Sequence, residues 1–131
     1  MALEHRGLTS KIIAAAIEVH YRLGPGFIES IYESALVLEL RKQGLEVEQQ
    51  VDVPVEYDGV VVGRHRLDLL VEGTIVVELK AIQNLENVHF AVVKSYLRAI
   101  GKERGMLLNF AKPTLDVKRV ICRQPDHFMV S

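Results

Sequence analysis

The sequence predicts an α/β domain in which two helices, three strands, one helix and two strands follow one another, the order ααβββαββ. Three observations carry this prediction. Apolar residues recur with helical period in three stretches, β-branched runs cut by turn residues fill the remainder, and no repeat or low-complexity linker interrupts the order. The 131 residues, 49% hydrophobic and 25% charged, suit one domain spanning 1–131, with a core of about 8–123.

Two helices are expected before residue 45. The first runs from about Ser10 to Leu23, with Thr9 or Ser10 as the N-cap, and Gly24-Pro25-Gly26 ends it. The second runs from about Phe27 to Gln43, where the apolar residues keep helical spacing. Gly44 follows at the position where a left-handed residue commonly closes a helix.

Three strands are expected next, arranged as a meander. The β-branched runs begin at Val47, and Asp58-Gly59 is a strong two-residue hairpin signal before the strand Val60–Leu70. A second turn at Glu72-Gly73-Thr74 leads into the strand Ile75–Lys80.

A helix and two further strands complete the predicted domain. Residues 85–100 return to helical spacing, and Gly101 terminates that helix. Strands of about Met106–Phe110 and Val117–Arg123 then follow.

The composition excludes several classes of protein. Cys122 is the only cysteine, so neither a disulfide within the chain nor a cysteine-based zinc cluster can form, which favours a cytoplasmic location. The longest apolar run, Ile12–Ile17, is far below the roughly 20 residues of a membrane span. We therefore expect no membrane partner, and no haem or nucleotide cofactor.

The charge is nearly balanced over the chain but unevenly distributed. Sixteen basic and seventeen acidic residues give a net charge of -1, whereas residues 98–123 hold seven basic and two acidic side chains. Such a segment favours either a basic face or a solvated mixed surface. If it is a basic face, it is a weak candidate for nucleic-acid contact through Arg98, Lys102, Arg104, Lys118 and Arg119.

Glu78 and Lys80 interrupt the apolar strand Ile75–Lys80 and alternate, so both point to one face. The position of Asp68 relative to them depends on the turn. A two-residue loop puts Asp68 opposite Val77, whereas a three-residue loop pairs residue 71 with 75 and puts Asp68 opposite Glu78. We predict the three-residue loop or a bulge.

Two adjacent carboxylates and a lysine suit Mg²⁺-dependent phosphodiester hydrolysis. Asp68 and Glu78 would hold the metal ion, and Lys80 would orient the attacking water or offset charge in the transition state. The alternative is that Glu78 and Lys80 form the solvated face of a half-buried strand, paired with Arg66 and Asp68 across the hairpin.

Two sets of residues resemble known motifs. Arg66-Leu67-Asp68 with Glu78-Leu79-Lys80 resembles the core signature of the PD-(D/E)xK nuclease superfamily. Gly26, Glu29 and Tyr32 resemble the motif that names the GxxExxY family. Further similar segments are Glu18-Val19-His20, Leu67–Val71, Val77–Ala81, Ser95-Tyr96-Leu97, Leu107–Phe110 and Lys118-Arg119-Val120.

The resemblance implies a restriction-endonuclease-like core with a mixed β-sheet flanked by helices. It implies catalytic roles for Asp68, Glu78, Lys80 and Glu29, with Asp68, Glu78 and Glu29 as ligands of Mg²⁺, for which Mn²⁺ can substitute. One position departs from the superfamily pattern, because Val92 stands where many members carry a glutamine.

Three further residues are candidates for supporting the site: Tyr32, His20 and Tyr96. Tyr32 is expected at the helix–sheet boundary, with its hydroxyl in water or bonded to Glu29. His20 either faces the site or serves as a capping or packing residue. Glu29 also suits the first turn of a helix without any metal, because an acidic side chain there is favourable against the helix dipole.

Two function classes follow. The first is a Mg²⁺-dependent nuclease or related phosphodiesterase that acts on nucleic acid. The alternative is a noncatalytic binding or regulatory module with the nuclease fold. Val92 at the usual glutamine position and the near-neutral net charge favour this alternative. Beyond these two classes stands a structural protein that associates with itself, since small single-domain proteins of nuclease-like fold often need a homodimer to present two sites to a duplex.

Overall fold

The computed structural model describes residues 2–124, with side chains from residue 6 onward. Its elements follow the predicted order ααβββαββ, which confirms the expected element order. They are α1 (Ala2–Leu23), α2 (Glu29–Lys42), β1 (Val47–Tyr57), β2 (Val60–Val71), β3 (Ile75–Lys80), α3 (Asn87–Ile100), β4 (Arg104–Asn109) and β5 (Asp116–Ile121). Within residues 2–124, no helix is long and apolar enough to cross a lipid bilayer.

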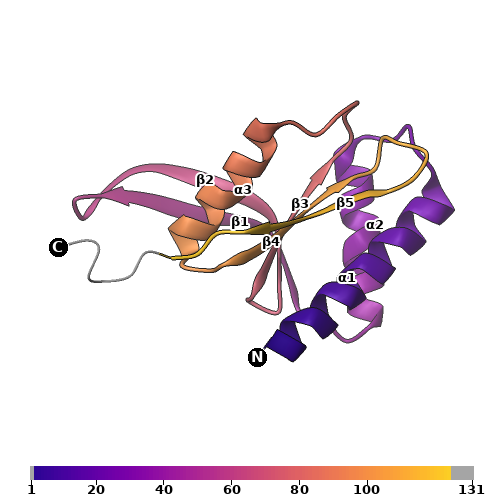
Figure 1. Ribbon diagram of the computed structural model, residues 1–131, viewed down its shortest axis with the longest axis horizontal. Helices are drawn as coiled ribbons and strands as arrows, with labels where there is room; N and C mark the ends of the chain where they lie inside the picture. The colour runs from indigo at the N-terminus through magenta and orange to yellow at the C-terminus, as the bar shows by residue number, and fades with distance from the viewer. Residues whose placement is uncertain (1, 125–131) are drawn as a thin grey trace.

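The five strands form one mixed sheet in chain order, β1-β2-β3-β4-β5. β3 and β4 are parallel because α3 carries the chain back between them, and the other neighbouring strands are antiparallel. Helices α1 and α2 pack on one face of the sheet and α3 on the other (Figure 1). The sheet therefore separates two apolar clusters, which we call the α1/α2 cluster and the α3 cluster. This arrangement is the predicted mixed sheet flanked by helices.

Helix α1 begins at Ala2, well before the predicted start at Ser10. Thr9 lies inside the helix and is buried, so neither Thr9 nor Ser10 is its N-cap. The prediction was wrong because Thr9 or Ser10 could cap the helix only if the residues before it were not helical, and here they are helical. Here Leu8 packs against the α1/α2 cluster, which extends the buried side of α1 toward the N-terminus.

The other boundaries differ from the predicted ones by at most two residues. Helix α2 begins at Glu29 because Ile28 is extended, with φ -79° and ψ 160°. Gly44 has a φ of 78° after α2, which confirms its predicted left-handed conformation. Gly101 ends α3 as predicted, with a φ of 69°.

The two predicted turns have the expected lengths. Asp58 and Gly59 have φ values of 54° and 76°, as a two-residue hairpin turn with two left-handed positions requires. Val71 pairs with Ile75, so the turn between β2 and β3 has three residues. This register was the one that places Asp68 opposite Glu78.

The long β1–β2 hairpin changes sides of the sheet at Gln50 and Asp68. Leu69 packs in the α1/α2 cluster, whereas Leu67, two residues earlier on the same strand, packs in the α3 cluster. On β1, Gln50 has a left-handed φ of 50° between the register pairs Gln49↔Leu69 and Val51↔Leu67. Asp68 thus lies where the hairpin crosses from one layer to the other, and the outer part of the hairpin extends beyond α3 (Figure 1).

Candidate active site

Asp68 stands where the pairing between β2 and β3 ends. The last register pair is Leu69↔Val77, and one further step places Asp68 opposite Glu78. The backbone N–H of Leu79 donates to Asp68 Oδ2 at 3.0 Å. The Asp68 carboxylate therefore accepts a hydrogen bond from β3 where the backbone pairing with β2 ends. This bond holds the carboxylate beside Glu78.

Glu78 is a buried acid with an unmatched oxygen. Its side chain is among the buried residues at 6% exposure, and Oε1 has no hydrogen-bond partner within the described part of the chain. Its other oxygen, Oε2, lies 3.9 Å from Lys80 Nζ. This burial overturns the alternative in which Glu78 lies on a solvated strand face.

The surroundings of Glu78 disfavour its negative charge. Burial, reinforced by the charge of Asp68, raises the pKa of Glu78 to about 8, and Lys80 opposes that rise only in part. Burial is also the largest cause that raises the pKa of Asp68, followed by the charges of Glu33 and Glu29. The cluster carries more negative charge than Lys80 balances, so a bound cation would relieve it.

Glu29 and Glu33 approach the same place from α2. Glu29 Oε2 accepts a hydrogen bond at 3.3 Å from the N–H of Ala81, the residue after β3. Glu33 lies one helical turn further along α2 and is buried. Its carboxylate accepts from Gln49 Nε2 at 3.1 Å and from Gln50 Nε2 at 2.9 Å and 3.1 Å.

Glu33 was absent from the sequence-based site. The signal for it was the four-residue spacing from Glu29, which places both acids on one side of a helix. Gln50 connects the two parts of the cluster, because its Nε2 also lies 3.5 Å from Asp68 Oδ1. A shallow groove of about 560 Å³ exposes this region, lined in part by Glu29, Glu33, Gln50 and Asp68.

Asn109 is a second residue that the sequence analysis missed. It is fully buried at the end of β4, in register with Lys80. Its Oδ1 accepts from the N–H of Ile82 at 3.1 Å, and its Nδ2 donates to the carbonyl of Ile82 at 2.9 Å. Asn109 thereby fixes the segment after Lys80. An asparagine in an otherwise apolar strand was the available signal.

Tyr32 supports the site through the loop before α2. Its hydroxyl donates to the carbonyl of Gly24 at 2.6 Å and accepts from the N–H of Phe27 at 3.1 Å. The ring is fully buried and stacks on Phe110 with centroids 4.5 Å apart. The expectation that the hydroxyl meets water or Glu29 was therefore wrong, because the loop folds back over the ring and satisfies it.

His20 and Tyr96 differ in their relation to the acids. His20 Nε2 lies 2.8 Å from the carbonyl oxygen of Lys112, which ties α1 to the β4–β5 connection and is a packing role. Tyr96 lies on α3, and burial together with the charges of Glu78 and Asp68 raises its pKa to about 12. The charges of both acids thus act on Tyr96, whereas His20 contacts the connection between β4 and β5.

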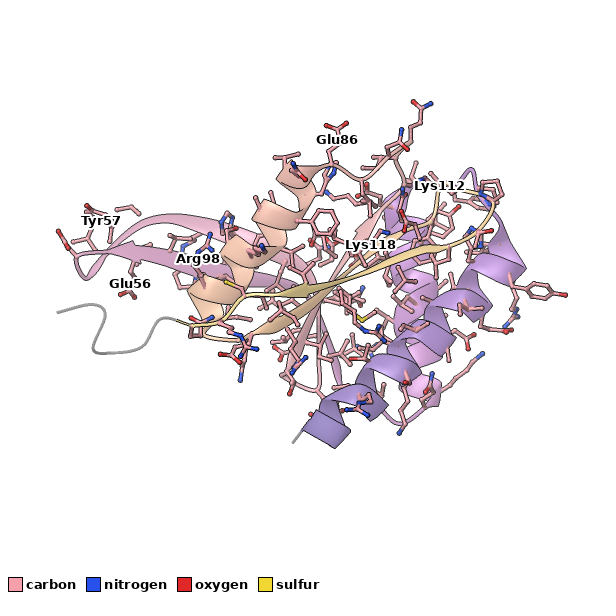
Figure 2. The ribbon with its side chains drawn as sticks, viewed as in Figure 1. Glu56, Tyr57, Glu86, Arg98, Lys112 and Lys118 are labelled. Atoms are coloured by element: carbon pink, nitrogen blue, oxygen red, sulfur yellow. The ribbon has the colours of Figure 1, made fainter. Side chains whose placement is uncertain are left out.

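The predicted nucleic-acid contacts do not form one surface. Arg104 and Arg119 lie on the α1-facing side of the sheet, in register with Ile121 and Met106 respectively. Lys118 lies on the opposite side, since its partner Leu107 packs in the α3 cluster. Arg98 is on α3 and Lys102 follows it, so the five side chains divide between two faces (Figure 2 labels Arg98 and Lys118).

The residues fit an open metal site rather than an enclosed one. Carboxylate oxygens are the ligands that Mg²⁺ prefers, and a Mg²⁺ ion is usually held by one or two of them. Asp68 and the unmatched Glu78 Oε1 supply such a pair. No three Asp, Glu, His or Cys side chains from the described residues are placed to hold one ion together. Val92 packs half-buried against the α3 cluster and adds no polar group.

Comparison with known proteins identifies the family and the fold. Residues 6–120 match the family model described as the PD-(D/E)XK nuclease superfamily. A solved structure described as the crystal structure of SSO0001 is 18% identical, with a TM-score of 0.57 over 77% of this chain and 52% of that chain. The chain thus spans about half the length of that protein, and the likeness shows a shared fold. No curated protein matches the chain.

Proposed function

Because the chain belongs to the PD-(D/E)XK nuclease superfamily, we propose that it is a metal-dependent nuclease with Asp68, Glu78 and Lys80 as its catalytic residues. The observation that carries the proposal is the buried Glu78, whose Oε1 has no partner in the described chain and whose neighbours are Asp68 and Lys80. Buried polar atoms are nearly always hydrogen-bonded, so the orphaned Oε1 favours a partner that the described chain does not itself supply, such as a cation. The Gly26, Glu29 and Tyr32 motif supports a place in the GxxExxY family.

PD-(D/E)XK nucleases generally use divalent metals, and we propose Mg²⁺ here, with Mn²⁺ as a substitute. Asp68 and Glu78 would hold the ion, with Glu29 as the further acidic ligand from α2. When bound, the cation supplies Lewis acidity and charge neutralisation at the scissile phosphate. Members of this fold act on phosphodiesters, so nucleic acid is the substrate class.

The protein's own residues would position the water and the phosphate. Lys80 Nζ, held near Glu78 at 3.9 Å, would orient the attacking water and offset charge as the bond breaks. Gln50 would bridge Asp68 and Glu33, because its Nε2 donates to Glu33 and lies 3.5 Å from Asp68 Oδ1. Asn109 would hold the chain after Lys80 and so fix the direction of β3.

Lys118 is the predicted phosphate contact that lies best for this site. Glu78 pairs with Leu107 and Leu107 pairs with Lys118, so the three side chains form one row across the sheet on the α3-facing side. With neighbouring strands about 4.8 Å apart, Lys118 starts about 10 Å from Glu78. That separation suits contact with a phosphate adjacent to the cleaved one.

Titration of Mn²⁺ into the wild type and Asp68→Asn by calorimetry tests the metal site without a choice of substrate. We expect one ion to bind the wild type and binding to weaken at least tenfold in Asp68→Asn. Asp52→Asn is the matched control, because Asp52 is an exposed aspartate on β1 that pairs with Arg64. Equal Mn²⁺ affinity in Asp68→Asn and Asp52→Asn would contradict the proposal.

A cleavage assay then separates the nuclease from the noncatalytic module. Labelled single- and double-stranded DNA and RNA are incubated with Mg²⁺ and with the wild type or Lys80→Ala. A nuclease cleaves one of them, and Lys80→Ala abolishes cleavage. The alternative is favoured by Val92, since an apolar side chain stands where many relatives carry glutamine. Retained binding in Lys80→Ala, with no cleavage by the wild type, would establish that alternative.

A further inference from the structure

A second pocket lies at the other end of the sheet from the acidic cluster. It has a volume of about 390 Å³ and opens between α1, the start of β4 and the end of β5. Three arginines line it, Arg6, Arg104 and Arg119, one from each of these elements. We call it the arginine pocket.

The strand register explains why the two sheet arginines meet there. Arg104 pairs with Ile121 and Met106 pairs with Arg119, so the arginines are diagonal neighbours on adjacent strands. Both lie on the α1-facing side, because Met106 belongs to the α1/α2 cluster. Arg6 reaches the same place from the first part of α1, one helical turn before Thr9.

The concentration of positive charge requires an explanation. Like charges at such positions are destabilising, and none of the three arginines forms an ion pair with an acidic side chain of residues 6–124. Guanidinium groups bind phosphate through two parallel hydrogen bonds, and several of them together neutralise its charge. The arrangement therefore matches an anionic ligand.

The floor of the pocket is apolar. Ile75 and Met106 are each 1% exposed, and Ile121 forms part of the wall. Apolar and polar groups share the lining about equally, and a pocket of this size suits a small organic ligand that carries a charged group. A bare phosphate would leave the apolar part of this pocket uncovered.

We propose that the arginine pocket binds a phosphate ester, with the phosphate on Arg104, Arg119 and Arg6 and the organic part over Ile75 and Met106. Arg104 pairs with Ile75, whereas Lys80 pairs with Asn109, so the two sites lie at opposite ends of β3, about 16 Å apart. The arginine pocket and the groove beside the acidic cluster also share no lining residue.

The inference therefore stands independently of the proposed nuclease activity. The ester comes from one of two sources, a free small molecule or the end of a nucleic acid.

Met106 provides a reporter inside the pocket. The chain has three methionines, and only Met106 lies within residues 2–124. Selective ¹³C-methyl labelling of methionine, with the Met106 signal assigned by Met106→Leu, then follows binding by NMR. The probes are adenosine 5′-monophosphate, adenosine, and a short oligonucleotide with and without a 5′-phosphate. Calorimetric titration of Mn²⁺ into a separate sample without probe reports the acidic cluster independently.

We expect a phosphorylated probe to shift the Met106 methyl signal and its unphosphorylated counterpart to leave it in place. Arg104→Gln/Arg119→Gln should weaken that binding at least tenfold, and Arg6→Gln should weaken it less. Lys94→Gln, which removes one exposed positive charge from α3, is the control and should bind as the wild type does. A response to adenosine monophosphate identifies a small-molecule ester, whereas a response confined to the 5′-phosphorylated oligonucleotide identifies a nucleic-acid end.

Two results would overturn the proposal. One is that no phosphorylated probe shifts the Met106 signal. The other is that the double arginine variant binds as tightly as Lys94→Gln while both keep the thermal stability of the wild type. The thermal comparison excludes loss of binding through unfolding, and Arg6→Gln offers a second variant if the double variant is unstable.

Discussion

The N–H of Leu79 donates a hydrogen bond to Asp68 Oδ2 at 3.0 Å, so β3 itself holds the carboxylate that faces Glu78. One oxygen of Asp68 is thereby used to fix position, and the other lies toward Gln50 at 3.5 Å. Leu79 lies between Glu78 and Lys80 in the chain. The three proposed catalytic residues are therefore positioned by one short stretch of backbone, and a shift of β3 would displace all of them.

The first prediction concerns the pH dependence of stability without metal. Because the folded state raises the pKa of Glu78 to about 8 from its ordinary 4.5, it holds this proton more tightly than the unfolded chain. The free energy of unfolding should therefore be highest below pH 4.5 for this group and fall as the pH rises toward 8. Asp68, whose pKa is also raised, contributes with the same sign.

Glu78→Gln removes the contribution of Glu78 to that dependence. We expect the variant to exceed the wild type in stability by about 1–3 kcal/mol at pH 8, and by less at pH 5. Urea unfolding with a chelator present at both pH values measures the difference. Glu48→Gln, at an exposed position on β1, should change neither value. A wild type as stable as Glu78→Gln at pH 8 would show that the burial of Glu78 carries no penalty.

The second prediction concerns metal binding and heat. A ligand at one hundred times its dissociation constant stabilises a protein by about 2.7 kcal/mol, which corresponds to a rise in Tm of about 10 °C for a domain of this size. We expect Mn²⁺ to produce such a rise at pH 8 and a smaller one at pH 5, because protons compete for Glu78. Thermal scans measure it. A rise of equal size in Asp68→Asn would place the ion elsewhere.

The third prediction concerns Tyr32→Phe. The substitution leaves the carbonyl of Gly24 and the N–H of Phe27 without the hydroxyl that bonds both, so stability should fall by about 1–2 kcal/mol. Mn²⁺ affinity should fall less than in Asp68→Asn, since Tyr32 acts through the loop before Glu29. Tyr21→Phe is the control, because Tyr21 is 84% exposed. Chemical unfolding and calorimetry measure the two effects, and equal stability of the two variants would contradict the role of the loop.

The fourth prediction concerns Gly105. A Cβ there would lie 2.8 Å from Val93 Cγ1 and 3.3 Å from the carbonyl oxygen of Val76, so α3 approaches β4 too closely for a side chain. Gly105→Ala should cost about 1–3 kcal/mol of stability. Gly63→Ala on β2 is the matched control, since a Cβ there meets no atom within 4 Å. Partial recovery in Gly105→Ala/Val93→Ala would identify the contact, and a Gly105→Ala variant as stable as Gly63→Ala would refute it.

The element order and both turns of the meander could be predicted because local residues determine them. Asp58-Gly59 allows two left-handed positions, and the three-residue turn after Val71 sets the register that brings Asp68 opposite Glu78. The start of α1 could not be predicted in this way. Its extension to Ala2 depends on Leu8, whose contact with the core is made by residues far away in the chain.

Local sequence is enough to predict the order of the elements, the register between β2 and β3, and the motif that contains Asp68, Glu78 and Lys80. These follow from backbone periodicity and turn geometry, which act over a few residues. Packing between distant elements is what brings Glu33 to the other acids, bonds Tyr32 to the loop before α2, and divides the basic side chains between two faces. Burial by elements distant in the chain raises the pKa of Glu78 in the same way. A side chain acquires its solvation and its electrostatic neighbours from the elements that pack around it, and these come from distant parts of the chain.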